Sequence, residues 1–425
     1  MVFKMNKKVL IIFPELKATI SRIRLHGIIK FLKYYGWEPV ILTNEETPLE
    51  EEFDTIFVPY DVDFISNKWK KYLGIKLNKT APQDIAHKEE IKQKIINRLI
   101  YHWQEIFLYP DELKEWRKEA VQAASYYIDK YGVDVVLSSF PPVTPHIIAM
   151  DLKKKYNIPW IADMRDLWTD YSYYRYGFLR KSIEKRLESK TLSAADHITT
   201  VSKPLENSLQ QNFKRVNVIE NGFDPDEVNK GTSLSDKFSI THTGQLYDGR
   251  RNPELLFKAL NELRNERKIN LDDFEINFYG DAENWLKKEV QEYKLENVVK
   301  IHGRVERKVS LRNQRSSHLL LLIRWDNPHE EGVFTGKIFE YLAAKRPIIS
   351  IGYVGGVIDE LLEKTNTGIS LNSVDGIKKE VFRAYSEFKS GQLNYSGIPE
   401  EINKYSHKEM ANKFANVFNN TLKWK

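Results

Sequence analysis

The sequence predicts an α/β protein with two successive domains, each containing a parallel sheet covered by helices on both faces. The chain has 425 residues, which exceeds one ordinary core and suits two domains of roughly 200 residues each. In both halves short apolar runs alternate with segments of helical periodicity, a pattern typical of parallel sheets. Between the two series, residues 221–237 are rich in turn formers and carry no periodicity, which indicates a linker.

The first series begins with a buried strand over residues 7–13 and an amphipathic helix over 21–36 that stops at Gly36. The elements expected after it are, in order, strands 38–43 and 54–60, a helical insertion at about 63–109, helix 111–132, strand 133–139, a helix through Asp151, strand 159–164, helix 178–195, strand 197–202, a further helix and strand 216–220. The first domain is therefore expected to span residues 1–224, with the linker proper at 225–237.

The second series repeats this alternation. Its expected elements are, in order, strand 238–244, a helix through Ala259 and Leu260, strand 274–280, a helix, strand 298–305, a short helix, strand 318–323, a helix around Tyr341, strand 346–352 and a strand at 368–371. We expect this domain to span 238–404, and the amphipathic helix of 405–425 to return to the first domain. A ligand site is expected in a cleft between the domains, at the facing carboxyl ends of their strands.

Composition excludes several classes of protein. The chain has no cysteine, so neither a disulfide framework nor thiolate chemistry is possible, and a reducing compartment is compatible with it. The apolar run from Val9 to Phe13 is shorter than the ~7–15 residues of a secretory signal, and no stretch reaches the ~20 apolar residues of a membrane span. Much of the net charge of +6 lies between Lys68 and Lys118, a pattern that fits contact with nucleic acid, an anionic membrane or only solvent.

The segment 332–350 carries the first candidate site. Gly332 and Gly336 bracket a turn, Lys337 opens a helix, and Glu340 lies on the same face one turn later. The backbone N–H groups and the positive dipole end of a helix start suit a phosphate, and Lys337 adds a full charge. The Glu340 carboxylate can accept hydrogen bonds from vicinal hydroxyls such as those of a ribose. The alternative is a capped helix with an exposed Lys–Glu pair.

The segment 241–260 is the second candidate. A strand runs into Gly244, and Arg250 and Arg251 then lie on a loop ahead of Pro253, which occupies the first turn of a helix. Guanidinium groups in such a place can bind a diphosphate bidentately. A solvated basic turn is the alternative.

The segment 159–171 is the third candidate. Asp163, Arg165 and Asp166 come at the end of an apolar strand and are expected at the cleft edge of the first domain. Carboxylates there can accept the proton of an acceptor hydroxyl or stabilise an oxocarbenium-like centre. The alternative is an Asp–Arg salt bridge with an N-cap.

Together these segments resemble the family 4 glycosyltransferases, which have the GT-B architecture of two facing Rossmann-like domains. The chain looks most like the bacterial members that build cell-surface polysaccharides. The resemblance covers nearly the whole chain, because eight stretches follow in the order of the family. They are residues 24–43, 133–149, 158–170, 194–205, 218–224, 242–256, 301–305 and 335–349.

The resemblance implies specific roles. The donor-binding residues that it implies are Gly244, Arg250, Arg251, Gly303, Arg304, Val305, Thr335, Gly336, Lys337 and Glu340. Within this set, Lys337 and one of the two arginines look like the clamp on the donor diphosphate, Glu340 resembles the carboxylate on the donor ribose, and residues 303–305 resemble the loop that reads the base. Asp163 and Asp166 lie where the first domain presents its catalytic carboxylates.

Two positions depart from the family pattern. Where the family often has Gly-Arg-Leu, this chain has Gly244-Gln245-Leu246, which transfers the cationic role to Arg250 or Arg251. The glutamates of the family are separated by seven residues, but the position expected from Glu340 is Gly332, and Glu331 lies one position away. A contact between Glu331 and the donor sugar is therefore left open.

Other candidates are interpreted as structural. Asp61 and Asp63 are similar to the Asp-X-Asp metal motif of the other glycosyltransferase architecture, but here they form an isolated acidic pair at a helix start. Five histidines lack the paired spacing of metal ligands, and they are His26, His146, His242, His302 and His318. His242 precedes the phosphate loop and is either a donor contact or a satisfied strand residue. No nucleic-acid-binding motif is present.

The resemblance implies a retaining enzyme that transfers a hexose-type sugar from a nucleoside diphosphate to a glycan or lipid-linked acceptor. It implies neither a cofactor nor a protein-bound metal, because fixed cations stabilise the leaving diphosphate. We expect the enzyme in the cytoplasm. For the insertion at 63–109, contact with the inner face of the membrane and packing onto the first domain are both open. A nucleotide-sugar 2-epimerase on the same scaffold and a non-catalytic sugar- or membrane-binding module are the alternative functions.

Overall fold

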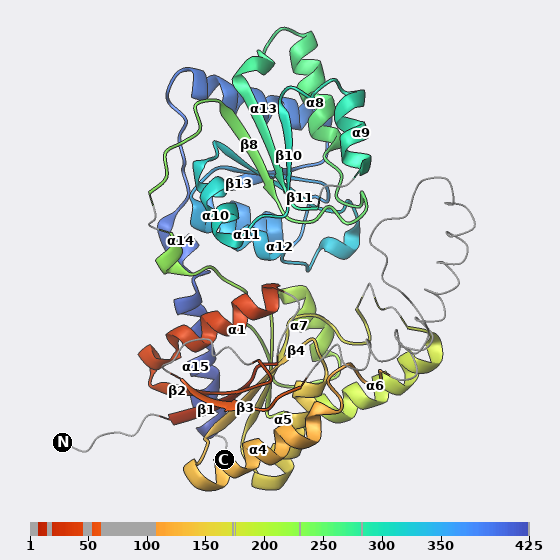
Figure 1. Ribbon diagram of the computed structural model, residues 1–425, viewed down its shortest axis with the longest axis vertical. Helices are drawn as coiled ribbons and strands as arrows, with labels where there is room; N and C mark the ends of the chain where they lie inside the picture. Colours follow the sequence, from red (N-terminus) through yellow and green to blue (C-terminus); the bar gives the residue numbers. More distant parts are fainter. Residues whose placement is uncertain are drawn as a thin grey trace, which may run out of the picture. The chain divides into compact units, whose positions relative to one another are not determined.

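The computed structural model describes residues 7–14, 19–45, 53–60, 108–171, 174, 176–228, 231–281 and 284–423. The expected insertion at 63–109 lies outside these residues except for its last two positions, as do Asp61 and Asp63. The chain forms two compact units (Figure 1). Unit 1 comprises Met1–Val201, Leu205–Val218 and Phe414–Lys425, and unit 2 comprises Ser202–Pro204 and Ile219–Lys413.

Unit 1 contains a seven-stranded sheet whose paired strands are all parallel. Its strands are β1 (Lys7–Ile12), β2 (Trp37–Thr43), β3 (Asp54–Phe57), β4 (Val135–Phe140), β5 (Trp160–Met164), β6 (His197–Thr200) and β7 (Val216–Val218). They lie in the order β3-β2-β1-β4-β5-β6-β7. The chain first adds strands on one side of β1 and then crosses to the other side, so the winding reverses between β1 and β4.

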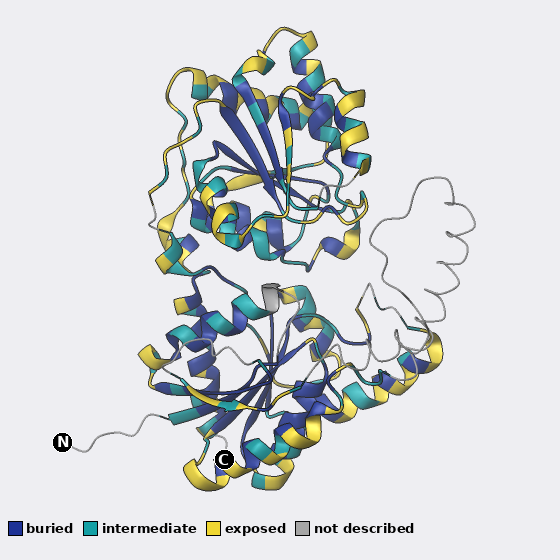
Figure 2. Ribbon diagram, viewed as in Figure 1, coloured by how far each residue is buried: buried dark blue, intermediate teal, exposed yellow. Residues whose placement is uncertain are grey.

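The helices of unit 1 bury the sheet. They are α1 (Thr19–Leu32), α4 (Trp116–Tyr131), α5 (Thr144–Tyr156), α6 (Phe178–Leu192) and α7 (Lys203–Gln210). Every residue of β4 and β5 is buried (Figure 2), as expected for parallel strands with helices on both faces. A short 3-10 turn (Lys33–Tyr35) follows α1, and the predicted stop at Gly36 is confirmed by its left-handed backbone, with φ 76°.

Unit 2 repeats this topology with six parallel strands. They are β8 (Phe238–Thr243), β9 (Phe274–Tyr279), β10 (Val299–Gly303), β11 (Leu319–Ile323), β12 (Ile348–Ile351) and β13 (Gly368–Leu371). Their order is β10-β9-β8-β11-β12-β13, so the winding reverses between β8 and β11. Its helices are α8 (Glu254–Asn265), α9 (Asn284–Glu292), α10 (Arg307–Ser316), α11 (Gly336–Ala344), α12 (Val357–Thr365), α13 (Val374–Lys389) and α14 (Pro399–Asn403).

The central strand β11 shows how the sequence fills both faces of the unit 2 sheet. Its five residues are Leu-Leu-Leu-Leu-Ile and are all buried. Leu319, Leu321 and Ile323 belong to the core shared with α8, α9 and α13, whereas Leu320 and Leu322 belong to the core shared with α11 and α12. Successive side chains of a strand point to opposite faces, so an uninterrupted apolar run is what a doubly covered strand requires.

The last helix, α15 (His407–Lys423), carries the chain back to unit 1. The ring of Phe418 packs edge-on against Trp37 of β2, with ring centroids 5.0 Å apart. Asn419 accepts a hydrogen bond from the Lys7 ammonium at 2.8 Å. The end of α15 is therefore part of the unit 1 fold.

Candidate functional site

The strand order of the unit 2 sheet points to one edge of the sheet as a candidate ligand site. β8 and β11 are neighbours, but the strands that follow them in the chain lie on opposite sides of this pair. Their carboxyl ends therefore flank the topological switch point, where doubly wound sheets bind ligands. The loop after β8 carries Gly244, Arg250 and Arg251, and the loop after β11 leads to Lys337. Two of the sequence-predicted segments thus meet at this edge.

Lys337 lies directly over Gly244. A β-carbon built on Gly244 would be 1.8 Å from Cε of Lys337 and 2.3 Å from its Nζ, and the φ angle of Gly244 is 115°. Both the close approach and the backbone conformation therefore require glycine at the end of β8. Lys337 is fixed in the first turn of α11, whose N-cap residue is Thr335. The ammonium is held above backbone at the N-terminus of a helix.

The charge of Lys337 has no close counterion in the part of the chain that the structure describes. Burial, and after it the nearby guanidinium of Arg251, lower its pKa to about 7, while the carboxylate of Glu340 opposes this shift. Arg251 is itself only loosely paired, with Nη2 3.8 Å from Oε2 of the buried Glu330. Two neighbouring cations, of which only Arg251 has a carboxylate of a described residue within 4 Å, make this site attractive to an anion.

A buried hydroxyl points to the same conclusion. Oγ1 of Thr335 is buried and has no hydrogen-bond partner among the described residues, and neither has Oε1 of Gln314 on α10. Native proteins leave few such atoms unsatisfied. Both atoms lie beside residues predicted to bind the donor, Thr335 next to Gly336, and Gln314 against Glu340 through its Nε2. The site therefore offers unused polar groups as well as unpaired charge.

Glu340 is already held in place by α10. Its Oε1 lies 3.3 Å from Nε of Arg307, and its Oε2 accepts a hydrogen bond from Gln314 Nε2 at 3.1 Å. Arg307 also donates two hydrogen bonds to Glu227, at 2.7 and 3.0 Å. These four residues line one small cavity. A carboxylate can accept about four hydrogen bonds, so the oriented Glu340 retains capacity for vicinal hydroxyls.

The sequence did not single out Arg307, Gln314 or Glu330. Arg307 and Gln314 lie on a polar helix without a motif, and their contacts with Glu340 span 33 and 26 residues, so no local pattern could have shown them. Of the two neighbouring glutamates, the buried Glu330 faces Arg251, whereas Glu331 is exposed. The carboxylate near the donor loops is therefore one position away from the residue that the spacing suggested.

The predicted base-reading loop starts at the same edge of the sheet. β10 ends at Gly303, whose φ of 75° turns the chain and whose carbonyl accepts a hydrogen bond from the Gly280 amide at 3.0 Å. Arg304 is exposed and pairs with Asp281, and Val305 is half-buried. Because β10, β9 and β8 are consecutive in the sheet, this loop and the loop after Gly244 both leave from the carboxyl edge.

The two arginines of the loop after β8 have different surroundings. Arg250 is exposed, and its guanidinium lies 5.6 Å from the ring centre of Trp325, which follows β11. Arg251 is nearly buried, lies over the Tyr247 ring at 4.7 Å, and influences the pKa of Lys337. Of the two arginines, Arg251 is therefore the one whose charge affects Lys337, and it is the better candidate for a site shared with this lysine.

Asp163 in unit 1 does not fit a direct catalytic role. Its carboxylate is completely buried and accepts hydrogen bonds from Nε and Nη2 of Arg24 at 3.0 and 2.8 Å. Ser139 and Thr199 donate two more, at 2.7 and 2.8 Å. These four bonds use the whole acceptor capacity of the carboxylate. Asp163 therefore anchors β5 to its neighbours, and these contacts argue against a direct role of its carboxylate in catalysis.

Asp166 has a different environment. It lies just beyond β5, is half-buried, and forms no hydrogen bond with any described residue. Burial raises the pKa of its carboxyl, and the charge of Arg165 opposes this shift. A partly exposed carboxylate with free acceptor sites is suited to orient a hydroxyl. Of the two aspartates, only Asp166 keeps the geometry of a candidate catalytic group.

Two known protein families match long stretches of this chain. Residues 60–227 match the family described as Glycosyltransferase Family 4, and residues 237–387 match the family described as Glycosyl transferases group 1. Together the two matches cover most of both units. The chain belongs to the family 4 glycosyltransferases. The architecture is the GT-B one, with two α/β domains, and the chain is a glycosyltransferase.

Solved structures with the same fold extend over the full length of this glycosyltransferase. A glycosyltransferase from Rickettsia africae is 18% identical over 98% of this chain and 99% of its own, with a TM-score of 0.62. A sucrose-phosphate synthase from Thermosynechococcus elongatus is 13% identical, with 99% and 100% coverage and a TM-score of 0.64. HepE from Anabaena, solved with UDP and glucose, is 12% identical, with 97% and 100% coverage and a TM-score of 0.59. No curated protein matches the chain.

Two buried histidines of this glycosyltransferase, His146 and His242, have partners within the fold, although Nε2 of His242 has none among the described residues. His146 is buried against Ser138, 2.7 Å away, and burial lowers its pKa to about 3. His242 has Nδ1 3.0 Å from the Leu321 carbonyl, and burial and Lys337 hold its pKa well below the usual value. Within the described ranges no group of three His, Asp or Glu side chains could hold a metal ion. Among those same residues, no helix is long and apolar enough to cross a membrane.

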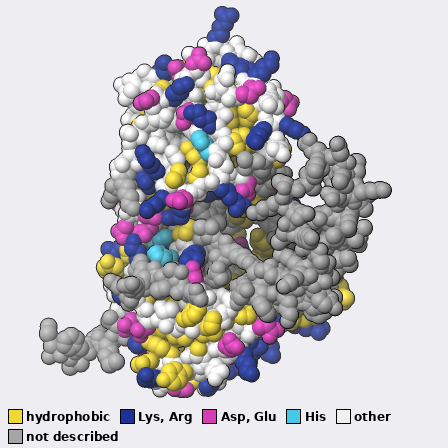
Figure 3. Space-filling model, viewed as in Figure 1, with side chains coloured by type: hydrophobic (Ala, Val, Ile, Leu, Met, Phe, Trp, Pro, Cys, Tyr) yellow, Lys and Arg dark blue, Asp and Glu magenta, His cyan; other side chains and the backbone are white. Residues whose placement is uncertain are grey.

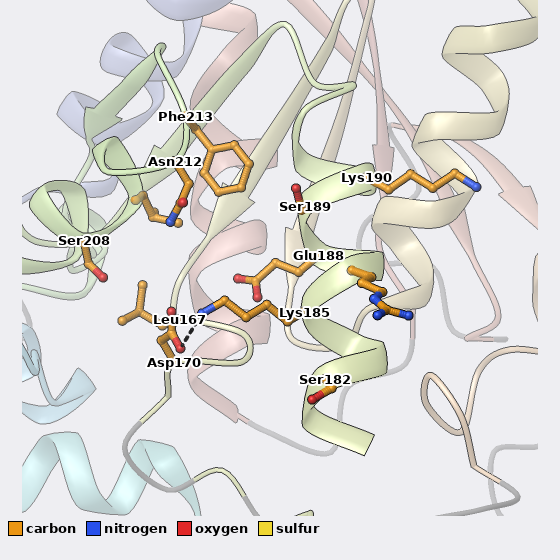
Figure 4. A pocket seen from close by; sticks show the side chains of 12 residues that line it. Leu167, Asp170, Ser182, Lys185, Glu188, Ser189, Lys190, Ser208, Asn212 and Phe213 are labelled. Atoms are coloured by element: carbon orange, nitrogen blue, oxygen red, sulfur yellow. Dashed lines mark ion pairs between the residues drawn. The ribbon is translucent and has the colours of Figure 1, made fainter. Parts of the chain in front are cut away.

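A separate hollow of about 700 Å³ lies in unit 1 along α6 (Figure 4). Lys185 of α6 reaches across to Asp170, with Nζ 3.6 Å from Oδ1. Ser208 of α7, Asn212 and Phe213 form the opposite wall. None of the residues that the sequence predicted to be catalytic or donor-binding lines this hollow.

On the face shown in Figure 3, acidic and basic side chains are interspersed over the described residues, which is typical of a solvated surface.

Proposed function

We propose that this glycosyltransferase transfers a sugar, with retention, from a nucleoside-diphosphate sugar to a glycan or lipid-linked acceptor. The proposal includes a role in bacterial cell-surface polysaccharide synthesis. It also includes a cytoplasmic location, and the absence of cysteine is compatible with that reducing compartment. One observation carries the donor assignment. Lys337, at the N-terminus of α11, is half-buried next to Arg251 and has no close counterion among the described residues.

The donor contacts follow from this geometry. The diphosphate binds Lys337, Arg251 and the N–H groups of the first turn of α11, which includes Gly336. Thr335 donates its unused hydroxyl, and Glu340, oriented by Arg307, accepts hydrogen bonds from the ribose. The main chain of residues 303–305 contacts the base. HepE was solved with UDP and glucose, which makes UDP the first nucleotide to test.

The proposed transfer does not need a protein side chain as the final acceptor of the proton from the acceptor hydroxyl. The bond between the anomeric carbon and the diphosphate oxygen breaks, and the electron pair remains on the diphosphate. A bond forms between the anomeric carbon and the acceptor hydroxyl oxygen, on the face that the diphosphate leaves. The hydroxyl proton moves to a phosphate oxygen. Fixed cations at Lys337 and Arg251 stabilise the charge that develops on the leaving group.

A thermal-shift series with UDP, ADP, GDP and CDP tests the donor assignment. A ligand that binds only the folded protein stabilises it, by about 2.7 kcal/mol at a hundred times its Kd. We expect one nucleoside diphosphate to raise the melting temperature and the corresponding nucleoside to have no such effect, because the diphosphate is the group that is clamped. If no nucleoside diphosphate raises the melting temperature, the donor site is wrongly assigned. Incubation of the nucleotide-sugar donor without an acceptor should yield no epimer, because an epimer would indicate the alternative function of a nucleotide-sugar 2-epimerase.

Affinity for the nucleoside diphosphate is expected to fall as the pH rises above 7. Lys337, with a pKa of about 7, loses its charge there in the free protein, whereas a bound diphosphate stabilises the protonated form. Binding above this pH therefore takes up a proton, and the affinity falls by up to about tenfold per pH unit. Calorimetry in buffers of different ionisation enthalpy measures the uptake. A pH-independent affinity with no proton uptake contradicts the assigned charge of Lys337.

Asp166→Asn is expected to lower kcat about tenfold while leaving the Kd for the nucleotide unchanged. The amide keeps the size of the side chain but loses the charge that orients the acceptor hydroxyl, and a charge-assisted hydrogen bond contributes about 1.5–3 kcal/mol. The measurement is turnover at saturating donor together with nucleotide binding. Asp170→Asn, which alters another aspartate of the same segment, is the control and should retain activity. Wild-type turnover by Asp166→Asn excludes this role.

Turnover is expected to survive an excess of chelator. The physical reason is that Lys337 and Arg251 supply positive charge at the leaving diphosphate, a role that a divalent ion fills in other phosphate sites. Activity is measured after treatment with EDTA and again after addition of Mg²⁺ or Mn²⁺. If chelation abolishes turnover and either ion restores it, Asp61 and Asp63 become the candidates for metal ligands.

A further inference from the structure

The first two turns of α6 expose an unusual concentration of apolar side chains. Phe178 is 81% exposed, Leu179 is 77% exposed and Ile183 is 52% exposed. The first two are the most exposed large hydrophobic side chains in the described part of the chain. Scattered single residues of this kind are normal on a protein surface, but three within six positions of one helix form a patch. Figure 2 shows the exposed residues along the outer side of α6.

The opposite side of α6 is firmly fixed to unit 1. Arg180 is buried and pairs with Glu184, with Nε 2.6 Å from Oε1. Glu184 also accepts a hydrogen bond from Nε1 of the buried Trp168 at 3.1 Å, and Nη2 of Arg180 donates to the carbonyls of Leu108 and Pro110 at 3.2 and 3.1 Å. The orientation of α6 is therefore determined by buried polar contacts, and its apolar residues remain outside because of this orientation.

Positive charge accompanies the apolar patch. The solvent-accessible side of α6, including the part that lines the hollow of unit 1, carries four cationic residues, Lys181, Lys185, Arg186 and Lys190. The two glutamates of the helix have partners within unit 1. Glu184 pairs with Arg180, and Glu188 accepts a hydrogen bond from the backbone N–H of Thr169. Lys181 and Lys185 share the single carboxylate of Asp170 at 4.0 and 3.6 Å. Arg186 and Lys190 form no ion pair with any residue that the structure describes.

We propose that this surface of α6, the three apolar residues and the four cations together, docks on an anionic lipid bilayer. Aromatic and aliphatic side chains enter the interfacial region, and each neighbouring Lys or Arg is attracted by anionic headgroups. A protein partner fits less well, because lysine is depleted in protein interfaces and three side chains provide far less than the ~800 Å² per partner of a stable complex. A few such contacts give reversible attachment without a membrane span.

This docking surface lies entirely in unit 1 and does not depend on the donor site proposed for unit 2. It consists of other residues than the insertion at 63–109, for which the sequence left membrane contact and packing onto the first domain both open. Attachment through α6 would bring the enzyme to the bilayer that holds a lipid-linked acceptor. Nucleotide binding in solution and vesicle binding can be measured separately, so failure of either proposal is recognised without reference to the other.

Co-sedimentation of the full chain with vesicles tests the proposal. The vesicles contain phosphatidylcholine, with or without phosphatidylglycerol. We expect binding to the anionic vesicles at low salt, weaker binding at high salt, and at least about tenfold weaker binding for the triple variant F178S/L179S/I183S. The variant R186Q/K190Q should lose about tenfold or more on anionic vesicles only. The control Y34S/Y126S removes two side chains of unit 1 that are 72% and 68% exposed and should bind like the wild type.

Three results would overturn the proposal. They are no binding of the wild type to anionic vesicles, equal binding of the wild type and the triple variant, and a change of oligomeric state in the triple variant with vesicle binding unchanged. The last result would make the patch an interface between copies of the chain. Because all altered side chains are exposed, each variant should keep the melting temperature and the nucleotide affinity of the wild type, which confirms that it is folded.

Discussion

Lys337→Ala is expected to weaken nucleoside-diphosphate binding by about ten- to a hundred-fold and to lower kcat/KM by more than this. Losing a charge-assisted contact costs about 1.5–3 kcal/mol, and losing one fixed group that stabilises developing charge typically costs about 10²–10³ in rate. The effect on turnover should exceed the effect on binding, because the charge on the diphosphate grows as the sugar leaves. Calorimetry of the nucleotide and initial rates at varied donor concentration give the two quantities.

The stability of the variant separates this role from a structural one. In the free protein Lys337 is half-buried beside Arg251, and its lowered pKa means that the folded state disfavours its charge. Removing it should therefore leave the melting temperature unchanged or raise it, although activity falls. Lys364→Ala removes an exposed lysine of the same unit and should change neither property. Unchanged nucleotide affinity in a folded Lys337→Ala protein removes Lys337 from the donor site.

The positions of the candidate donor-binding residues could be predicted largely from the sequence, because these positions are determined locally. Gly244 ends an apolar strand, and Gly336 and Lys337 begin a helix, so their places at the carboxyl edge follow from secondary structure and parallel topology. The packing of Lys337 over Gly244 could not be predicted, since it joins residues 93 positions apart in the chain. The same applies to Arg307, which orients Glu340 from another helix.

On the acceptor side, by contrast, the contact that determines the role of Asp163 comes from a residue far away in the sequence. The strand that ends at Met164 could be predicted from its apolar run, but alternation along a strand does not tell which polar residue is turned inward to a partner. Asp163 is turned inward because Arg24, 139 residues earlier, lies on α1 opposite its carboxylate. The alternative considered for this segment was an Asp–Arg salt bridge, and the structure shows such a pair between Asp163 and Arg24 of α1. A long-range contact of this kind leaves no periodic signal in the sequence.

Arg24→Met is expected to destabilise unit 1 by about 3–5 kcal/mol, because it leaves the Asp163 carboxylate charged and buried. For a unit of this size the melting temperature should fall by roughly 6–20 °C. The double variant Arg24→Met/Asp163→Leu should recover most of this loss, since no charge is then left unpaired. The control is Arg117→Met, which breaks an Arg–Asp pair of the same unit with Nε 2.7 Å from Asp151, but with Arg117 47% exposed. Its cost should be below about 1 kcal/mol.

The pH dependence of the pair follows from the same contacts. Burial alone would raise the pKa of the Asp163 carboxyl, but Arg24 and the hydroxyl of Ser139 outweigh burial and lower it. The stabilisation is therefore present at neutral pH and is lost as the pH falls through this lowered pKa. Melting curves of the wild type should drop at acid pH more steeply than those of the double variant. If Arg24→Met melts like the wild type, the pair does not hold unit 1 together, and Asp163 returns to the list of candidate catalytic residues.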